Sequence, residues 1–173
     1  MNVARALLTV VLALILQVAF ARYAVGGRWV FDLVLVGVVY AALYWGPVAG
    51  MWAGTVGGLM QDALTGDVIG VGGLVKTAAG FGVGVAGGQF AVTHPAARAA
   101  TVGVATVAHR LIIVGLLAGI DQEWHGVPWG AVFMEMGLNA AAGFLAFQVT
   151  DALPGAIRNS QRRRRSSLSR RRW

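Results

Sequence analysis

The sequence predicts an all-α membrane protein whose chain crosses the bilayer six times. Charged residues make up only 12% of the chain and hydrophobic residues 57%, whereas a soluble domain usually has about 25% charged residues. So little charge cannot cover a water-facing surface. The apolar residues also gather in runs near the roughly 20 residues that a membrane-spanning helix needs. Both observations argue against a soluble enzyme and against a free DNA-binding protein.

Turn residues and interfacial aromatic residues divide the chain into six apolar runs. The second run lies between Trp29 and Trp45, and tryptophan is typical of membrane interfaces. Pro95 breaks the chain after the fourth run, and Pro154 ends the sixth. We therefore expect one six-helix transmembrane domain over residues 1–155. Its expected spans are residues 6–20, 31–45, 47–64, 69–90, 99–120 and 127–153.

The first run has a second interpretation. Residues 19–21, Ala-Phe-Ala, have the small-x-small form of a signal-peptide cleavage site. A first membrane span with Arg5 on its cytoplasmic side explains the run equally well, and the chain stays apolar beyond it. We therefore favour a retained first span.

Basic residues set the expected orientation in the membrane. Of the 14 Lys and Arg residues, eight are arginines between Arg158 and Arg172. Cytoplasmic segments are enriched in basic residues, so we place the C-terminus in the cytoplasm, and six spans place the N-terminus there too. Arg22 and Arg28 then lie on the outer side of the membrane, contrary to this bias. An alternative with five spans removes little of this conflict.

The polybasic tail at residues 156–173 has little apolar content, so we expect it to be disordered without a partner. Each basic residue near a membrane surface adds about 1 kcal/mol of attraction to anionic lipids. Lipid contact is therefore its expected role; an acidic cytoplasmic partner is the alternative, and nucleic acid is not expected. The arginines expected to face the lipid are Arg162, Arg163, Arg164, Arg165, Arg170, Arg171 and Arg172.

Small residues recur every four positions in the third and fourth runs. Residues four apart lie on one helix face, and small residues there let helix backbones approach closely in lipid. Asp62 continues the first row, and Gly72 and Lys76 begin the second. We expect the two rows to pack against each other as a helical hairpin. The glycines assigned to this packing are Gly50, Gly54 and Gly58 in the third run and Gly80, Gly84 and Gly88 in the fourth.

Charged residues inside the runs are expected to form pairs, because an unpaired ion in the bilayer costs free energy. Asp62 lies shortly before the turn between the third and fourth runs, and Lys76 lies shortly after it. Their depths match in an antiparallel hairpin, so we expect them to meet. Asp67 is the competing partner for Lys76.

A second pair follows from the same argument. Arg110 in the fifth run and Glu135 in the sixth lie at matching depths, so we expect contact between them, with His109 or Asn139 as polar neighbours. We interpret the pair as one that orients helices. The alternative, a proton or solute relay, normally needs a chain of titratable groups across the membrane.

The residues do not assemble into a catalytic set. No nucleophile, base and orienting group can be grouped from their positions, and the chain has no cysteine for a disulfide or a thiolate-bound metal. We therefore expect no enzymatic activity, no cofactor and no metal site.

Four short motifs follow one another in the first half of the chain. They are FDLVL at 31–35, WGP at 45–47, GGLMQD at 57–62 and IG at 69–70, and Gln17 lies late in the first run. Their order and spacing resemble the MreD family of bacterial rod shape-determining membrane proteins. Lys76 is not part of this resemblance, and the arginine tail is longer than the family requires.

The resemblance implies a six-helix fold similar to the substrate-binding S-component of energy-coupling-factor vitamin transporters. It implies no catalytic activity. It places the chain in the bacterial cytoplasmic membrane, within the peptidoglycan elongation machinery. The partners it implies are an MreC-like bitopic protein, the MreB filament, a RodA-type glycosyltransferase and its class B penicillin-binding protein.

Two functional interpretations follow. The first is a scaffold that holds an MreC-like transmembrane helix by lateral packing, at the ends of the glycine-rich spans or on the sixth helix. The second is an S-component that binds a vitamin-like solute. S-components usually carry alanines every four residues in the first helix, whereas Leu8, Val10 and Gln17 interrupt that row here, so we favour the scaffold. The polar groups available to a solute site are Asp62, Lys76, Arg110, Glu135 and Asn139.

Overall fold

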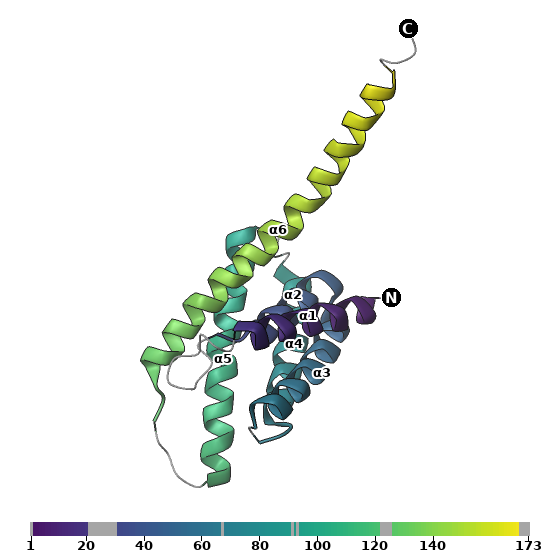
Figure 1. Cartoon of the computed structure of the whole chain (residues 1–173). Helices are drawn as coiled ribbons and strands as arrows, with labels where there is room; N and C mark the ends of the chain where they lie inside the picture. The colour runs from purple at the N-terminus through teal and green to yellow at the C-terminus, as the bar shows by residue number, and fades with distance from the viewer. Residues whose placement is uncertain are drawn as a thin grey trace.

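The computed structural model describes residues 2–20, 31–66, 68–90, 92, 94–121 and 126–169, and this part of the chain is all-helical, as the sequence predicts. Figure 1 shows helices α1 to α4 gathered together and the longer α5 and α6 beside them. The helices are α1 (Asn2–Phe20), α2 (Leu33–Trp45), α3 (Pro47–Thr65), α4 (Val71–Phe90), α5 (Pro95–Asp121) and α6 (Trp129–Ser169).

Within the part of the chain that the structure describes, three helices are long and apolar enough to cross a membrane. Their candidate spans are Asn2–Phe20, Pro95–Gly119 and Trp129–Ala152. Helix α2 has only 13 residues, about 20 Å of helix against a hydrocarbon core of about 30 Å. Helices α3 and α4 have the length, but glycine replaces many of their aliphatic side chains. The count of six spans therefore stays a prediction.

Helix α2 lies at the centre of the fold. It contacts all five other helices, and residues from Val34 to Ala42 are buried apart from Tyr40. A short helix that is apolar on every side belongs inside a protein. Asp32 caps its start, where the carboxylate accepts a hydrogen bond from the Leu35 N–H at 2.9 Å.

Helices α3 and α4 form the expected antiparallel hairpin. Gly46, with φ of 89°, connects α2 to α3, and Pro47 occupies the first turn of α3, where its missing N–H leaves no helical hydrogen bond unmade. Helix α3 ends at Gly66, which has the left-handed φ of 73° that glycine adopts without strain.

Helices α5 and α6 form a second pair, which meets the rest of the protein through α2 and α4. Among the described residues, neither helix contacts α1 or α3. Val36, Val39, Val102, Ala105 and Phe147 form the apolar part of the junction. The α5–α6 pair is therefore attached to the other four helices along a limited surface.

The end of α6 differs from the sequence-based expectation. The candidate span Trp129–Ala152 agrees with a sixth span that ends before Pro154, but the helix itself continues to Ser169, and its last part extends away from the other helices in Figure 1. Proline removes one backbone hydrogen bond, but the arginine-rich segment after it has high helix propensity, so the helix continues through Pro154. The disorder expected of residues 156–173 in the absence of a partner stays a prediction.

Candidate functional site

The two glycine rows face each other across the α3–α4 hairpin. A Cβ atom at Gly54 would overlap the backbone of Lys76, and one at Gly58 would lie 2.5 Å from the Gly73 Cα. Gly50 is opposed to Gly80 in the same way, with the Gly80 carbonyl oxygen 2.6 Å from the place of a Gly50 Cβ. These glycines are thus used inside the protein, where their backbones touch.

The end of the second row does not take part in this packing. A Cβ at Gly84 would overlap the Cα of Pro47, the first residue of α3, whereas a Cβ at Gly88 would meet nothing within 4 Å among the described residues. Gly88 lies one helical turn beyond Gly84, and α3 has no residue left to oppose it. The packing expected at Gly88 is therefore wrong.

Asp62 is buried, but its partners are backbone amides. Its Oδ2 accepts hydrogen bonds from the N–H groups of Gly70, at 2.9 Å, and Gly73, at 3.1 Å. The first N–H groups of a helix lack partners within the helix, and the helix dipole favours a negative charge there. The carboxylate of Asp62 therefore fastens the turn between α3 and α4, and no cation pairs with it among the described residues.

The expected pair of Asp62 with Lys76 is wrong, because Lys76 pairs with Asp32 instead. The Lys76 Nζ lies 2.8 Å from the Asp32 Oδ2 and 3.1 Å from the His109 Nε2. Asp32, Lys76 and His109 have at most 5% of their surface exposed. The competing candidate, Asp67, lies outside the described residues. Because α2 is short, Asp32 at its start lies inside the protein. There its carboxylate meets Lys76, which the sequence analysis pairs with Asp62.

Asn139 of α6 also belongs to this cluster. Its Oδ1 accepts a hydrogen bond from the Asp32 N–H at 2.9 Å, and its Nδ2 donates to the Thr106 Oγ1 at 3.1 Å. Sequence reasoning placed His109 and Asn139 beside Arg110 and Glu135, but their hydrogen bonds go to Lys76, Asp32 and Thr106 instead.

The buried polar cluster, defined as Asp32, Lys76, Thr106, His109 and Asn139, joins four helices. One residue comes from the start of α2 and one each from α4 and α6, and α5 supplies two. Nearby, the Gln17 side chain of α1 accepts a hydrogen bond from the Val34 N–H at 3.1 Å. Breaking a buried ion pair by removing one partner costs about 3–5 kcal/mol, so the Asp32–Lys76 pair fastens the start of α2 to α4. The hydrogen bonds of His109 and Asn139 attach α5 and α6 to this pair.

The sequence contained a signal for this cluster. In lipid each buried charge needs a partner, and the expected pairs left Asp32 without one. In the structure its carboxylate has two roles: one oxygen caps α2 and the other meets Lys76.

Arg110 and Glu135 lie together, as their depths predict. The Arg110 Nε meets the Glu135 Oε2 between α5 and α6. The Glu135 side chain is 5% exposed, whereas the Arg110 side chain is 38% exposed. The guanidinium group therefore reaches the outside of the helix pair, with its carboxylate partner enclosed.

A third polar group lies at the other end of α2. The Tyr44 hydroxyl donates to the Asp151 Oδ1 at 2.7 Å, and an Arg98 Nη lies 2.9 Å from the Asp151 Oδ2. The guanidinium carbon of Arg98 lies 5.2 Å from the centre of the Tyr44 ring and 5.4 Å from that of Phe147, within cation–π range. This group, which sequence reasoning missed, ties α2, α5 and α6 together.

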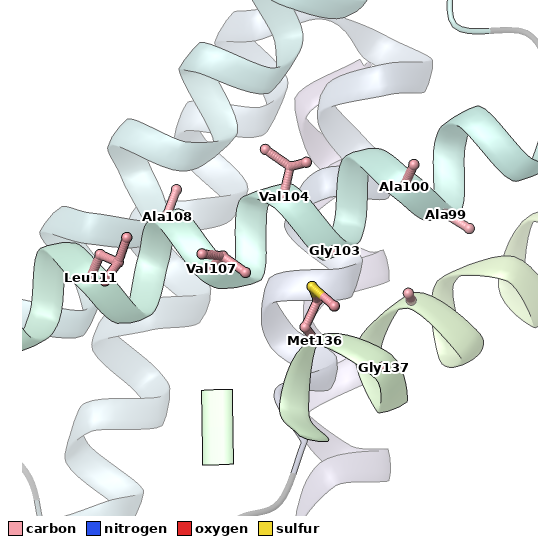
Figure 2. A pocket seen from close by; sticks show the side chains of 10 residues that line it. Ala99, Ala100, Gly103, Val104, Val107, Ala108, Leu111, Met136 and Gly137 are labelled. Carbon is pink, nitrogen blue, oxygen red and sulfur yellow. The ribbon is translucent and has the colours of Figure 1, made fainter. Parts of the chain in front are cut away.

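An open apolar groove runs between α5 and α6. Its volume is about 550 Å3. Figure 2 shows the α5 residues in a row, with Met136 of α6 pointing towards Gly103. The lining residues are Ala99, Ala100, Gly103, Val104, Val107, Ala108 and Leu111 of α5 and Met136, Gly137 and Ala140 of α6.

Comparison with protein families decides the classification. A family model described as rod shape-determining protein MreD matches residues 2–136. The chain belongs to the MreD family. The match covers α1 to α5 and the start of α6. No curated protein and no solved structure matches the chain, so the likeness to transporter S-components stays an expectation.

Membership of the MreD family makes this chain a rod shape-determining protein, and its apolar helices make it a membrane protein. The structure gives three of the resembling residues a physical role. Gln17 bonds the start of α2, Asp32 holds Lys76 and caps α2, and Asp62 fastens the α3–α4 turn. None of the three faces the groove.

Proposed function

We propose that this MreD-family chain is a non-catalytic scaffold of the bacterial rod complex that holds the transmembrane helix of an MreC-like protein. In this role it helps to regulate cell shape and peptidoglycan synthesis from the bacterial cytoplasmic membrane. The observation that carries the proposal is the apolar groove between α5 and α6. We also propose multiple membrane spans, with both termini in the cytoplasm.

The groove has the properties of a helix-binding surface. Its lining is free of charged and polar side chains, and Ala100, Val104, Ala108 and Gly137 within it are exposed. In lipid, close approach of backbones at small residues drives helix association, and alanine and glycine permit that approach. The glycine rows of α3 and α4 serve to pack these two helices together, because each row is turned towards the other helix.

Membership of the MreD family also supports a proposal about the other members of the rod complex. MreB, a RodA-type glycosyltransferase and a class B penicillin-binding protein are the further partners we propose. The arginine-rich tail supports contact with anionic lipids at the cytoplasmic surface.

The transport alternative gains no support from the side chains proposed for a solute site. Asp62, Lys76 and Asn139 bond other protein groups, and Arg110 meets Glu135. A vitamin-like ligand needs a few converging polar groups in a pocket, and the groove lining offers none.

Binding of the MreC-like protein to groove variants tests the scaffold proposal. A Cβ atom at Gly137 would meet nothing within 4 Å among the described residues, so we expect Gly137→Leu to leave the chain folded while the added side chain projects into the groove. Gly115→Leu is a matched control, because Gly115 is also exposed on α5 with nothing within 4 Å, but lies outside the groove. Affinity is measured with both full-length proteins in lipid nanodiscs.

We expect Gly137→Leu to weaken binding at least tenfold, equivalent to about 1.4 kcal/mol, and Gly115→Leu to leave it unchanged. Both substitutions remove a helical glycine, so both raise helix propensity alike. Equal binding by Gly137→Leu and the unaltered chain would show that the partner uses another face.

A further inference from the structure

Arg110 is placed where the proposed partner helix would pass. It follows Val107 by three positions and precedes Leu111 directly, and both of these residues line the groove. Residues three apart are neighbours on a helix surface, so Arg110 borders the groove on α5. Its partner Glu135 precedes Met136, another lining residue, on α6.

The depth of Arg110 makes its exposure costly in lipid. The candidate span of α5 runs from Pro95 to Gly119, so Arg110 lies three residues from its midpoint, about 4.5 Å along the helix. The core of a bilayer extends about 15 Å from its centre, beyond the reach of the side chain from that depth. Exposed donors there require an acceptor from protein or water.

The protein itself supplies one acceptor to Arg110. The Nε meets the Glu135 Oε2, and no other hydrogen-bond partner of Arg110 is present among the described residues. The side chain is 38% exposed, and its terminal nitrogens are not among the buried unpartnered atoms of the described residues, so they are accessible from the surroundings. Lipid tails cannot accept hydrogen bonds, so this edge of the groove is complementary to a polar group.

The charge of the pair selects the kind of acceptor. Arg110 and Glu135 together are formally neutral, so a second carboxylate would leave one uncompensated negative charge inside the bilayer, which is costly. A neutral acceptor satisfies the donors without that cost, and the amide oxygen of Asn or Gln or the hydroxyl oxygen of Ser or Thr provides it.

We propose that the groove receives a transmembrane helix that carries a neutral hydrogen-bond acceptor, an amide or a hydroxyl oxygen, opposite Arg110. This inference rests on the proposed function and specifies the chemistry of the partner helix. The apolar lining supplies the packing surface, and the guanidinium fixes the depth and rotation at which the helix docks.

The test removes the donors without leaving a buried charge alone. The double variant Arg110→Met with Glu135→Leu deletes both ions, and replacing a buried pair by apolar residues is often neutral for stability. Binding of the MreC-like protein is measured in nanodiscs, beside single Leu substitutions of each Asn, Gln, Ser and Thr in the partner's transmembrane helix. Thermal unfolding in detergent confirms that the double variant is folded.

We expect the double variant to bind about three- to twentyfold more weakly, which is the range of one interhelical hydrogen bond in a membrane. One partner substitution should weaken binding to the unaltered chain by a similar factor and have no further effect on the double variant. Unchanged binding by the folded double variant, while Gly137→Leu still blocks binding, would overturn the inference and leave the proposed function standing. If Gly137→Leu also binds normally, the partner uses another face, and both this inference and the groove as the docking site are overturned.

Discussion

At the scale of the residue, buried charges and amides decide how this fold is held together. Asp32 and Asp62 are both buried carboxylates, with 5% and 4% of their surface exposed, but one faces an ammonium group and the other faces backbone N–H groups. A carboxylate that balances a buried cation is harder to replace than one that only accepts hydrogen bonds. The two residues therefore form a natural comparison.

We expect Asp32→Asn to lower the free energy of unfolding by about 3–5 kcal/mol, because it leaves the Lys76 charge buried and unpaired. Asp62→Asn should cost about 1 kcal/mol, since the amide oxygen still accepts from the Gly70 and Gly73 N–H groups. Thermal unfolding of the purified variants in detergent measures both effects. Asp32→Asn with Lys76→Met should recover much of the loss; failure to recover would mean that the pair is not the cause.

Sequence reasoning at this scale identified which residues carry charge, but not which would meet. Depth matching succeeded for Arg110 and Glu135, because α5 and α6 are adjacent in the chain and run antiparallel. Depth matching failed for Lys76 because it compares only helices that follow one another in the chain. Asp32, the partner of Lys76, comes from α2, and α2 is not adjacent to α4 in the chain. Contacts between helices distant in the sequence depend on the packing of the whole fold.

At the scale of the element, glycine decides where helices touch. Helices α3 and α4 approach so closely that a Cβ at Gly54 would overlap the Lys76 backbone. The four-residue spacing predicted this hairpin, because it places small residues on one face. The spacing could not tell where the contact would stop, since this depends on α3 beginning at Pro47, opposite Gly84.

Alanine substitutions separate packing glycines from free ones. Gly54→Ala should lower stability by about 1–3 kcal/mol, because the two backbones must move apart. Gly82→Ala, on the same hairpin but with nothing within 4 Å of its Cβ position, should raise stability by about 0.5–1 kcal/mol through helix propensity. The measurement is the unfolding temperature of each variant in one detergent, and a similar shift for both would contradict the close helix contact.

At the scale of the whole molecule, the α5–α6 pair is a unit that the short central helix holds at both ends. Asp32, before α2, belongs to the buried polar cluster, and Tyr44, near the end of α2, contacts Arg98 and Asp151. The apolar junction lies between them. Because the groove lies on this pair, the position of the proposed partner helix depends on these two attachments.

The attachment at Tyr44 can be weakened on its own. Arg98→Met removes the ion pair with Asp151 and the cation–π contacts while it keeps an apolar side chain, and Tyr44→Phe removes a single hydroxyl. Since the Asp151 side chain is 44% exposed, the pair contributes about 1 kcal/mol or less. Local opening of α6 near Asp151 should therefore become up to about fivefold more frequent in Arg98→Met, and less than that in Tyr44→Phe.

Hydrogen–deuterium exchange of the backbone amides in α6 reads this opening directly. The amides of the α3–α4 hairpin are the internal control, because the helices of that hairpin contact neither Asp151 nor α6 among the described residues. Faster exchange confined to the end of α6 would show that the pair is fastened locally at each end of α2. Equal acceleration in the hairpin would mean instead that the six helices open as one cooperative unit, in which the attachment at Tyr44 has no separate role.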